Sequence, residues 1–548
     1  MCAPHVAAQS MKRVQAVRAV PVISSKYKLS ALFAAVMSAG CSAVLGIDDY
    51  EVLDASADAG PAEMPECTTH RDCSERVSAD PDTTMGGPVV CIKTAGRCAR
   101  LRSEDCNTIT GDYQNERAIF VGSLFSTTGA QASTNLARQQ SAMLAIEEIN
   151  AAGGIPANNS SADGRPLVMV SCDESVNLLR AGRHLIDDLK VPAIIGPNTS
   201  QDTLDLSNKL SIMSGTLLMS PTAVASSIAD LLDNGLTWQI IPTDVQRAPL
   251  MIQEINTLET RLRQERSRQE IRLSVIYRDD ALGQGTRAAL SSLLLNGRPL
   301  ADPINLGNNV RIDPYDPRLS TQQAIVDANL KFAPDIIVLA GPAEAITSVL
   351  VPLEAAWPGP AETRPEYVMI DSAKVPELLS AVTGNDDLRR RIRGTGVTPG
   401  VSSIAVNDAF MVSYATRYPN APANIFGMGP AYDSTYAVAF AIAGSRDMPV
   451  TGASIAQGLR RLSGGSTAIE VQGTKVLAAF RKLAAGEAIT AIGTFSNLQW
   501  NESGAVLGGT IELWCVASQN GKATYDRSGL MLDTATGQAF GQYTQCSP

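Results

Sequence analysis

The chain has 548 residues, of which 45% are apolar, 5% aromatic and 18% charged. A chain of this length is too long to fold around one small hydrophobic core, so we expect an N-terminal appendage followed by a large body of two lobes. Residues 1–40 carry five of the 45 basic side chains and no acidic ones, so 40 basic and 55 acidic residues remain, a net charge of −15. This acidic balance repels nucleic acid and anionic lipid headgroups, and neither is an expected partner.

The first forty residues have the pattern of an export signal. Basic residues precede an apolar run at 29–37, which is too short to span a bilayer. Small residues at 38–40 and then Cys41 follow, and this ending resembles a bacterial lipobox, whose cysteine is lipidated. Ser38 departs from that pattern, which usually has leucine there. We therefore expect a signal peptide at 1–40 and an exported protein in the periplasm or on the cell surface. Acyl chains on Cys41 would be its only attachment to a bacterial membrane.

Residues 41–66 are acidic and rich in small side chains, a composition that predicts a flexible linker between the lipidated cysteine and the folded body. A cysteine-rich module is expected next, at 67–106, where five of the ten cysteines lie.

Cysteines this dense indicate either a metal site or disulfides. The spacings of 5, 17, 6 and 7 intervening residues lack the tight C-x2-C pairs that zinc favours, and the export signal favours oxidation. Two bridges are expected among Cys67, Cys73, Cys91 and Cys98, for which three pairings are open. The remaining expected pairs are Cys106 with Cys172 and Cys515 with Cys546.

From residue 118 onward, buried-strand runs alternate with helical stretches. A strand at 118–125 is followed by a helix at 136–150, whose apolar residues recur at helical spacing. Further strands are expected at 166–171, 193–195, 217–219, 273–277, 336–340 and 367–371. The alternation predicts parallel sheets covered on both faces, and two such series predict an α/β protein with two doubly wound lobes.

Three of the expected strand ends are rich in Ser, Thr and Gly: 126–129, 198–200 and 220–222. Ligands of doubly wound sheets bind at the carboxyl ends of strands, and hydroxyls and N–H groups at helix starts suit a carboxylate or another polar anion. Helix capping alone explains any one of these loops, whereas three at successive strand ends favour a binding site.

Several segments, read together, resemble a known family. They are Ala-Ile-Glu-Glu-Ile-Asn-Ala-Ala-Gly-Gly-Ile at 145–155, Ala-Ile-Ile-Gly-Pro at 193–197, Ser-Pro-Thr-Ala at 220–223 and Tyr-Arg-Asp-Asp-Ala-Leu-Gly-Gln-Gly at 277–285. Over about residues 117–515 the chain is similar to type I periplasmic binding proteins of the leucine/isoleucine/valine-binding group, the solute-binding proteins of ABC transporters.

The resemblance implies a binding domain at 107–548, with two lobes joined by three crossovers. The crossovers would lie near 241–245, 397–401 and 488–494. The first lobe would comprise 117–243 and 400–487, and the second 244–399 and 488–515.

The family's ligand residues transfer unevenly. Ser200 stands where the family uses a serine to hold an amino acid's carboxylate, but Thr395 replaces the family's carboxylate, which pairs with the ligand's ammonium. Leu282 and Val224 likewise replace a tyrosine and a threonine. Candidate replacements for the missing counter-charge are Asp280 and Asp371, although a surface or turn role is the more common one for each. The predicted ligand-binding set is Ser126, Gly129, Ser200, Ser220, Thr222, Ala223, Asp280, Asp371 and Thr395.

Catalytic motifs are scarce. The sequence has three histidines and neither a Gly-x-Ser-x-Gly elbow nor a phosphate loop, so no enzyme, cofactor or metal is expected, although its many carboxylates leave a paired-acid hydrolase open. The expected function is capture of a small polar ligand, amino-acid-like or related, for an ABC importer whose permease subunits would be the partners. A surface sensor, favoured by the cysteine-rich module and the linker, and a structural lipoprotein with a degenerate cleft are the alternatives.

Overall fold

The computed structural model describes residues 66–79, 87–156, 164–422, 425–544 and 546. The predicted signal peptide, Cys41 and the linker up to residue 65 lie outside the described residues. None of the helices in the described part combines the length and apolarity needed to cross a membrane.

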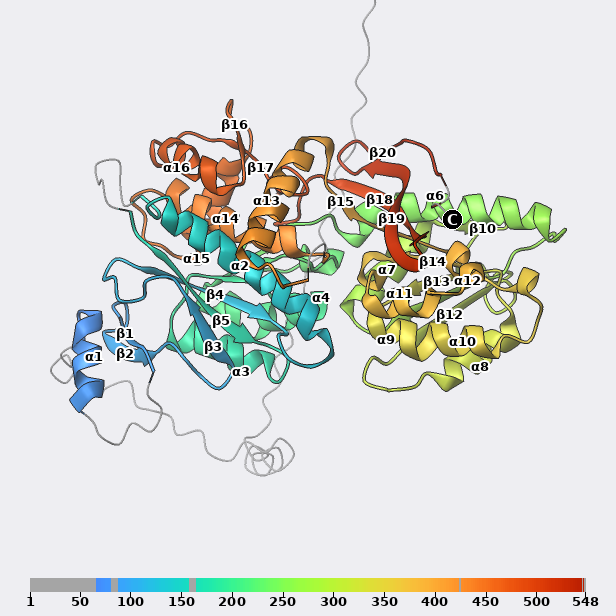
Figure 1. Cartoon of the computed structure of the whole chain (residues 1–548), viewed down its shortest axis with the longest axis horizontal. Helices are drawn as coiled ribbons and strands as arrows, with labels where there is room; N and C mark the ends of the chain where they lie inside the picture. The colour runs from blue at the N-terminus through green and yellow to red at the C-terminus, as the bar shows by residue number, and fades with distance from the viewer. Residues whose placement is uncertain (1–65, 80–86, 157–163, 423–424, 545, 547–548) are drawn as a thin grey trace, which may run out of the picture. The chain divides into compact units, whose positions relative to one another are not determined.

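A six-stranded sheet forms the centre of the first lobe, where Figure 1 labels β3, β4 and β5. The order of its strands is β3-β5-β4-β6-β7-β8. Its strands are β3 (Cys106–Thr110), β4 (Ile119–Phe125), β5 (Leu167–Asp173), β6 (Ala193–Ile195), β7 (Leu217–Ser220) and β8 (Thr237–Gln239). All are parallel except β3, which pairs antiparallel with β5 at the edge. Along β4, Val121 and Phe125 belong to one apolar cluster and Leu124 to the cluster on the opposite face, because successive strand residues alternate.

Helices cover both faces of this sheet, as predicted. They are α2 (Ala132–Ala151), α3 (Leu178–Arg183), α4 (Ser200–Leu206), α5 (Ile212–Ser214), α13 (Ile404–Arg417), α14 (Met428–Gly444), α15 (Gly452–Leu459) and α16 (Val476–Ala484). α14 is buried along its whole length and packs against α2, with Tyr432 and Tyr436 both donating to the Glu148 carboxylate at 2.6 Å.

The second lobe contains an eight-stranded sheet in the order β12-β9-β13-β14-β15-β18-β19-β20. Its strands are β9 (Leu273–Arg278), β12 (Val310–Tyr315), β13 (Ile336–Ala340), β14 (Glu366–Ile370), β15 (Ile392–Thr398), β18 (Thr510–Gln519), β19 (Lys522–Asp533) and β20 (Gln538–Phe540). The strands from β12 to β15 are parallel, whereas β18, β19 and β20 are antiparallel. The α/β prediction is confirmed, but this sheet is mixed rather than wholly parallel, because the C-terminal segment returns as a hairpin.

The helices of the second lobe surround the parallel part of its sheet. They are α6 (Asp244–Glu265), α7 (Ala281–Ala289), α8 (Gln323–Phe332), α9 (Ala343–Ala345), α10 (Val351–Ala356), α11 (Pro376–Val382) and α12 (Asp386–Arg391). Two short two-stranded ladders complete the body: β10 (Leu294–Leu295) with β11 (Arg298–Pro299), and β16 (Ala468–Glu470) with β17 (Thr490–Ile492).

Three chain segments connect the lobes, and two of them lie where the sequence predicts. They run from β8 to α6, and from β15 to α13. The third lies later than 488–494, because β17 still pairs with β16 and Trp500 packs edge-to-face on Trp238 in the first lobe. It therefore falls between Val506 and the start of β18, beside the first connection, where Gln246 Nε2 donates to the Val506 carbonyl at 3.0 Å.

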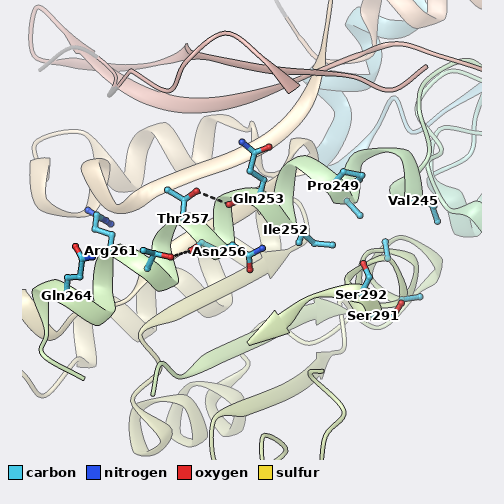
Figure 2. A pocket seen from close by; sticks show the side chains of 14 residues that line it. Val245, Pro249, Ile252, Gln253, Asn256, Thr257, Arg261, Gln264, Ser291 and Ser292 are labelled. Carbon is cyan, nitrogen blue, oxygen red and sulfur yellow. Dashed lines mark hydrogen bonds between the residues drawn. The ribbon is translucent and has the colours of Figure 1, made fainter. Parts of the chain in front are cut away.

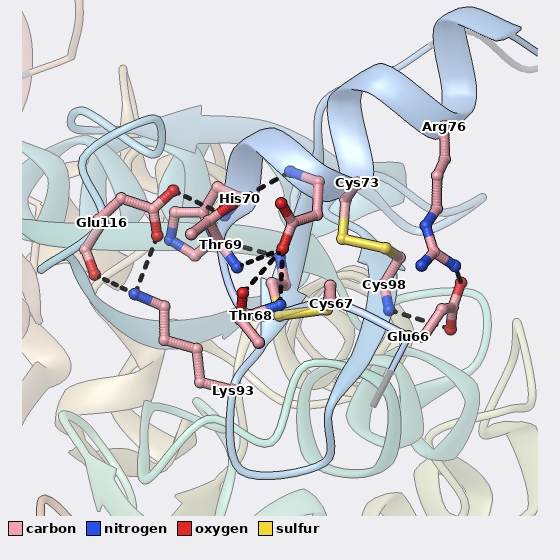
Figure 3. Close-up of a disulfide and its surroundings, with 12 residues drawn as sticks. Glu66, Cys67, Thr68, Thr69, His70, Cys73, Arg76, Lys93, Cys98 and Glu116 are labelled. Atoms are coloured by element: carbon pink, nitrogen blue, oxygen red, sulfur yellow. Dashed lines mark hydrogen bonds and ion pairs between the residues drawn. A yellow bond between two sulfur atoms is a disulfide. The ribbon is translucent and has the colours of Figure 1, made fainter. Parts of the chain in front are cut away.

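The cysteine-rich region folds as α1 (His70–Ala79) and the hairpin of β1 (Val89–Ile92) and β2 (Arg97–Arg100) (Figure 3). Disulfides join Cys67 to Cys91 and Cys73 to Cys98, one of the three open pairings. The other pairs are Cys106–Cys172 and Cys515–Cys546, as expected.

This region is packed onto the first lobe rather than standing apart from it. Val90 and Leu101 share an apolar cluster with Val170 of β5, and the His70 ring packs edge-to-face on Phe120. In Figure 3, Glu116 approaches both His70 and Lys93, with Lys93 Nζ 2.9 Å from Glu116 Oε2.

Candidate functional site

The carboxyl ends of strands from both sheets open into one cleft of about 270 Å³. The first lobe contributes loops that follow β4, β6 and β7, and the second lobe contributes loops that follow β9, β13 and β14. Parallel strands place all their carboxyl ends at the same edge of a sheet, which brings loops distant in sequence to one place.

The cleft contains part of the predicted ligand-binding set. Ser126, Ser200, Thr222, Asp280 and Asp371 line it. The other predicted residues, Gly129, Ser220, Ala223 and Thr395, are not among its lining residues. Ser220, Ala223 and Thr395 are at most 1% exposed, and Gly129 forms the turn before α2 with φ of +76°.

The hydroxyl side chains of the first lobe are engaged in shaping their own loops. Ser200 Oγ accepts the N–H groups of Val224 at 3.0 Å and Ala225 at 3.1 Å. Ser220 Oγ donates to the Pro197 carbonyl at 2.6 Å. These bonds tie the loop after β6 to the loop after β7, so the hydroxyls position backbone around the cleft.

The two aspartates already have cationic partners. Asp280 Oδ1 caps α7 by accepting the N–H groups of Leu282 and Gly283, and its Oδ2 lies 2.9 Å from Arg278 Nε. Asp371 Oδ2 lies 2.5 Å from Arg247 Nη1, in a pair that is nearly sealed from solvent. Neither carboxylate therefore supplies a free counter-charge in place of the one missing at Thr395.

Arg138 of α2 is the cleft residue that sequence reasoning missed. It is 9% exposed, and it donates from Nε to the Phe426 carbonyl at 2.7 Å and from Nη1 to Asn135 Oδ1 at 2.9 Å. Burial lowers the pKa of Arg138 to about 10, which leaves it cationic at neutral pH. Helical spacing was the available signal, because position 138 lies on the same buried stripe of α2 as Ala142 and Ala145.

Two further acids belong to this region, the buried Glu174 beside the cleft and the partly buried Asp202, which lines it. Glu174, directly after β5, is 6% exposed; its Oε1 lies 3.4 Å from Ser126 Oγ, and its Oε2 has no partner within the described residues. Burial and the neighbouring Asp202 raise the pKa of Glu174 well above its ordinary value. Burial also raises the pKa of Asp202, whose carboxylate accepts the Thr199 hydroxyl at 2.6 Å. Burial thus disfavours the charged form of both carboxyl groups.

A larger hollow, of about 1110 Å³, lies along one side of α6 (Figure 2). Its polar groups do not converge on a common point, because Thr257 and Thr260 donate to carbonyls of their own helix. Arg261 pairs with Glu366 at 2.6 Å. The interlobe cleft is therefore the better candidate for a binding site.

A metal centre is not formed by the clustered cysteines. The sulfurs of Cys67, Cys73 and Cys91 lie within 4.8 Å of one another, but all three are in disulfides.

Residues 118–295 match the family model described as periplasmic binding protein, and the two lobes with three connections have the type I fold of that class. The sequence itself matches none of the curated proteins compared with it.

Solved structures support the same fold over most of the chain. LivJ, the branched-chain amino acid transporter substrate-binding protein of Streptococcus pneumoniae in complex with isoleucine, is 18% identical. The match covers 75% of this chain and 99% of LivJ with a TM-score of 0.53. The leucine-binding protein LivK of Thermotoga maritima is 15% identical over 74% of this chain and 97% of its own, with the same TM-score of 0.53.

A third neighbour binds a different kind of compound. It is a solute-binding protein of an ABC transporter from Rhodopseudomonas palustris, in complex with 3,4-dihydroxybenzoic acid. It is 14% identical over 78% of this chain and 99% of its own, with a TM-score of 0.52. The family and these neighbours are solute-binding proteins, not enzymes.

Proposed function

We propose that the protein captures a small polar solute outside the cytoplasm by closing its two lobes around the interlobe cleft. The observation that carries this proposal is the cleft itself, which strand-end residues of both lobes line. Ser200 and Thr222 approach it from the first lobe, and Asp280 and Asp371 from the second. A ligand that touches both lobes binds the closed state more tightly than the open state, and therefore shifts the equilibrium toward closure.

Delivery of the solute to the permease subunits of an ABC importer is the first candidate role. Support comes from two of the neighbours: LivJ is a transporter substrate-binding protein, and the Rhodopseudomonas palustris protein is the solute-binding protein of an ABC transporter. Cells that lack the protein would then lose uptake of its ligand, whereas unchanged uptake would contradict the importer role.

A surface sensor is the second candidate, favoured by the cysteine-rich region. That region shares an apolar cluster with the first lobe and is tied to it by the ion pair of Arg180 with Asp105 at 2.7 Å. A rigidly attached region beside a ligand-binding lobe offers a surface to a protein partner. Uptake that persists without the protein, together with a lost response to the ligand, would support this role.

We further propose that Cys41 carries the lipid anchor, since the small residues before it resemble a lipobox. The native protein should then partition into the detergent phase of a two-phase extraction, and the C41A variant should not form the lipidated mature species. A native protein whose mature N-terminus carries no acyl group would reject the anchor.

Thermal melting of the whole exported chain tests solute capture. The panel would contain amino acids, their oxo-acid analogues, amides, aromatic acids and sugars. A ligand at 100 times its dissociation constant adds about 2.7 kcal/mol to the stability of the native state. Small-angle scattering with a compound that raises the melting temperature should show a smaller radius of gyration, because closure compacts the two lobes. A cooperative transition that no compound shifts would count against solute capture.

A further inference from the structure

Arg138 is a buried cation without an anionic partner in the cleft. Both of its recorded acceptors, the Phe426 carbonyl and the Asn135 side chain, are neutral oxygens. A guanidinium has five N–H donors, so further donors stay available for a ligand. No acceptor for its Nη2 is found in the described part of the chain, and no carboxylate lies within ion-pair distance of it there.

The other cations of the cleft differ from Arg138 in this respect. Arg278 lies 2.9 Å from Asp280, and Lys374 Nζ lies 2.9 Å from Glu512 Oε1. Their charges are therefore balanced before any ligand enters. Arg138 is the lining cation, among the described residues, that lacks such a partner.

The nearby acids do not balance Arg138 either. Asp371 and Glu174 are close enough to interact with its charge, but neither makes an ion pair with it. Asp371 is held by Arg247 at 2.5 Å, and burial favours the neutral form of Glu174. A buried, unbalanced guanidinium is costly, and an incoming carboxylate offers it the bidentate partner that best suits its shape.

The cleft offers little to an ammonium group. Where the resemblance places the family's ammonium-binding carboxylate, this chain has Thr395, which is 1% exposed within the sheet. Three aspartates line the cleft, but Asp280 and Asp371 are paired with arginines. Burial disfavours the charged form of the third, Asp202, which accepts the Thr199 hydroxyl. An apolar part of the wall contains Val224, Leu282, Val375 and Phe426. Such a wall suits an apolar body rather than a second charge.

From these contacts we infer that the ligand is an organic acid without an ammonium group, an oxo acid or an aromatic carboxylate, whose carboxylate is bound by Arg138. This inference rests on the proposed function of the cleft and adds the chemical class of the solute. It makes Arg138 the residue that determines specificity for an anion.

Matched pairs of probes test the inference with the whole exported chain. Leucine and 4-methyl-2-oxopentanoate share a carbon skeleton and a carboxylate but differ in the ammonium group. 3,4-Dihydroxybenzoate and catechol share a ring but differ in the carboxylate. Calorimetric titration should show that at least one of the two acids binds about tenfold or more tighter than its matched probe. The oxo acid is compared with leucine, and 3,4-dihydroxybenzoate with catechol.

Variants at Arg138 identify the residue responsible. R138Q should weaken binding of the acids by about a hundredfold, and R138K by less, because lysine keeps the charge but loses the planar fork. R417Q is the matched control, since Arg417 is an exposed partner of Glu147 on the same lobe. R138K keeps the test valid if R138Q does not melt cooperatively.

The outcomes separate the two proposals. Tighter binding of leucine than of its oxo acid, or acid binding that R138Q and R138K leave unchanged, would overturn the anion site while leaving solute capture standing. A protein whose melting no probe of either kind shifts would reject solute capture and the anion site together.

Discussion

Asp433 is the basis of a pH-dependent stability that a single substitution should remove. It lies in α14, is 2% exposed, and its Oδ2 accepts the backbone N–H of Thr494 at 2.8 Å and the Thr494 hydroxyl at 2.7 Å. Its Oδ1 has no partner among the described residues. Burial raises the pKa of Asp433 from 3.8 to about 7, although the bonds from Thr494 act in the opposite direction.

The direction of the pH dependence of stability follows from whether the native or the unfolded state holds the proton more tightly. Because the native-state pKa of Asp433 lies above the unfolded-state value, the native protein holds the extra proton between about pH 4 and 7. Each rise in pH through this window therefore removes stability. At about 1.36 kcal/mol per pKa unit the full effect approaches about 4 kcal/mol, of which about 3 kcal/mol falls between pH 5 and 8.

Urea unfolding at a series of pH values measures this effect in the wild type and in D433N. Asparagine keeps an acceptor for Thr494 but cannot ionise, so the difference between the two free energies of unfolding should change by about 3 kcal/mol from pH 5 to 8. D408N, at an exposed position of α13, should leave the pH dependence unaltered. Wild-type and D433N curves that run parallel over this range would refute the reasoning.

Three further substitutions probe the fold and the cleft. S200A removes the acceptor of two buried N–H groups, so melting should show a loss of about 1–3 kcal/mol even without ligand. E354Q breaks the buried pair of Glu354 with Arg391 at 2.6 Å, and should lower the free energy of unfolding by about 3–5 kcal/mol in urea. Replacing Cys106 and Cys172 together by serine opens the bridge between β3 and β5, with an expected loss of about 2–5 kcal/mol.

Each of these three predictions has a contradicting result. Unchanged stability of S200A would mean that water replaces the hydroxyl, and that the loop after β7 does not depend on it. A neutral E354Q would show that Arg391 is satisfied by Asp387 and the Pro365 carbonyl alone. If the double serine variant is as stable as the wild type in non-reducing urea, the Cys106–Cys172 bridge does not contribute to the free energy of unfolding.

Much of the fold was predictable from local sequence patterns. The strands expected at 193–195 and 336–340 are β6 and β13 with the same bounds, because short apolar runs between helical stretches mark buried parallel strands. β12 escaped prediction, since it contains Asp313 and Pro314 and lies at the edge of its sheet, where proline is tolerated. β19 escaped for a related reason, because much of it is only partly buried and its apolar pattern is weak.

The site was predictable only in part. Loops after β4, β6 and β7 were expected at the cleft because parallel strands bring their ends together, and Ser126, Ser200 and Thr222 line it. The orientation of Ser220 and Thr395 could not be predicted from the sequence. Whether a side chain at a strand end faces the cleft or the sheet depends on the neighbouring strands.

The sequence by itself determined the alternation of strands and helices and the two-lobed α/β class, because burial periodicity is a local property. It only suggested the Cys106–Cys172 and Cys515–Cys546 pairs, whose cysteines lie 66 and 31 residues apart in the chain. Tertiary structure alone decided three features: the position of the third connection, the lack of an anionic partner for Arg138, and the pairing among Cys67, Cys73, Cys91 and Cys98. Those depend on which distant segments become neighbours: Trp500 reaches Trp238, and α2 turns Arg138 toward Phe426. Helical spacing could indicate that Arg138 is buried, but its lack of a counter-charge depends on which side chains surround it in the folded protein.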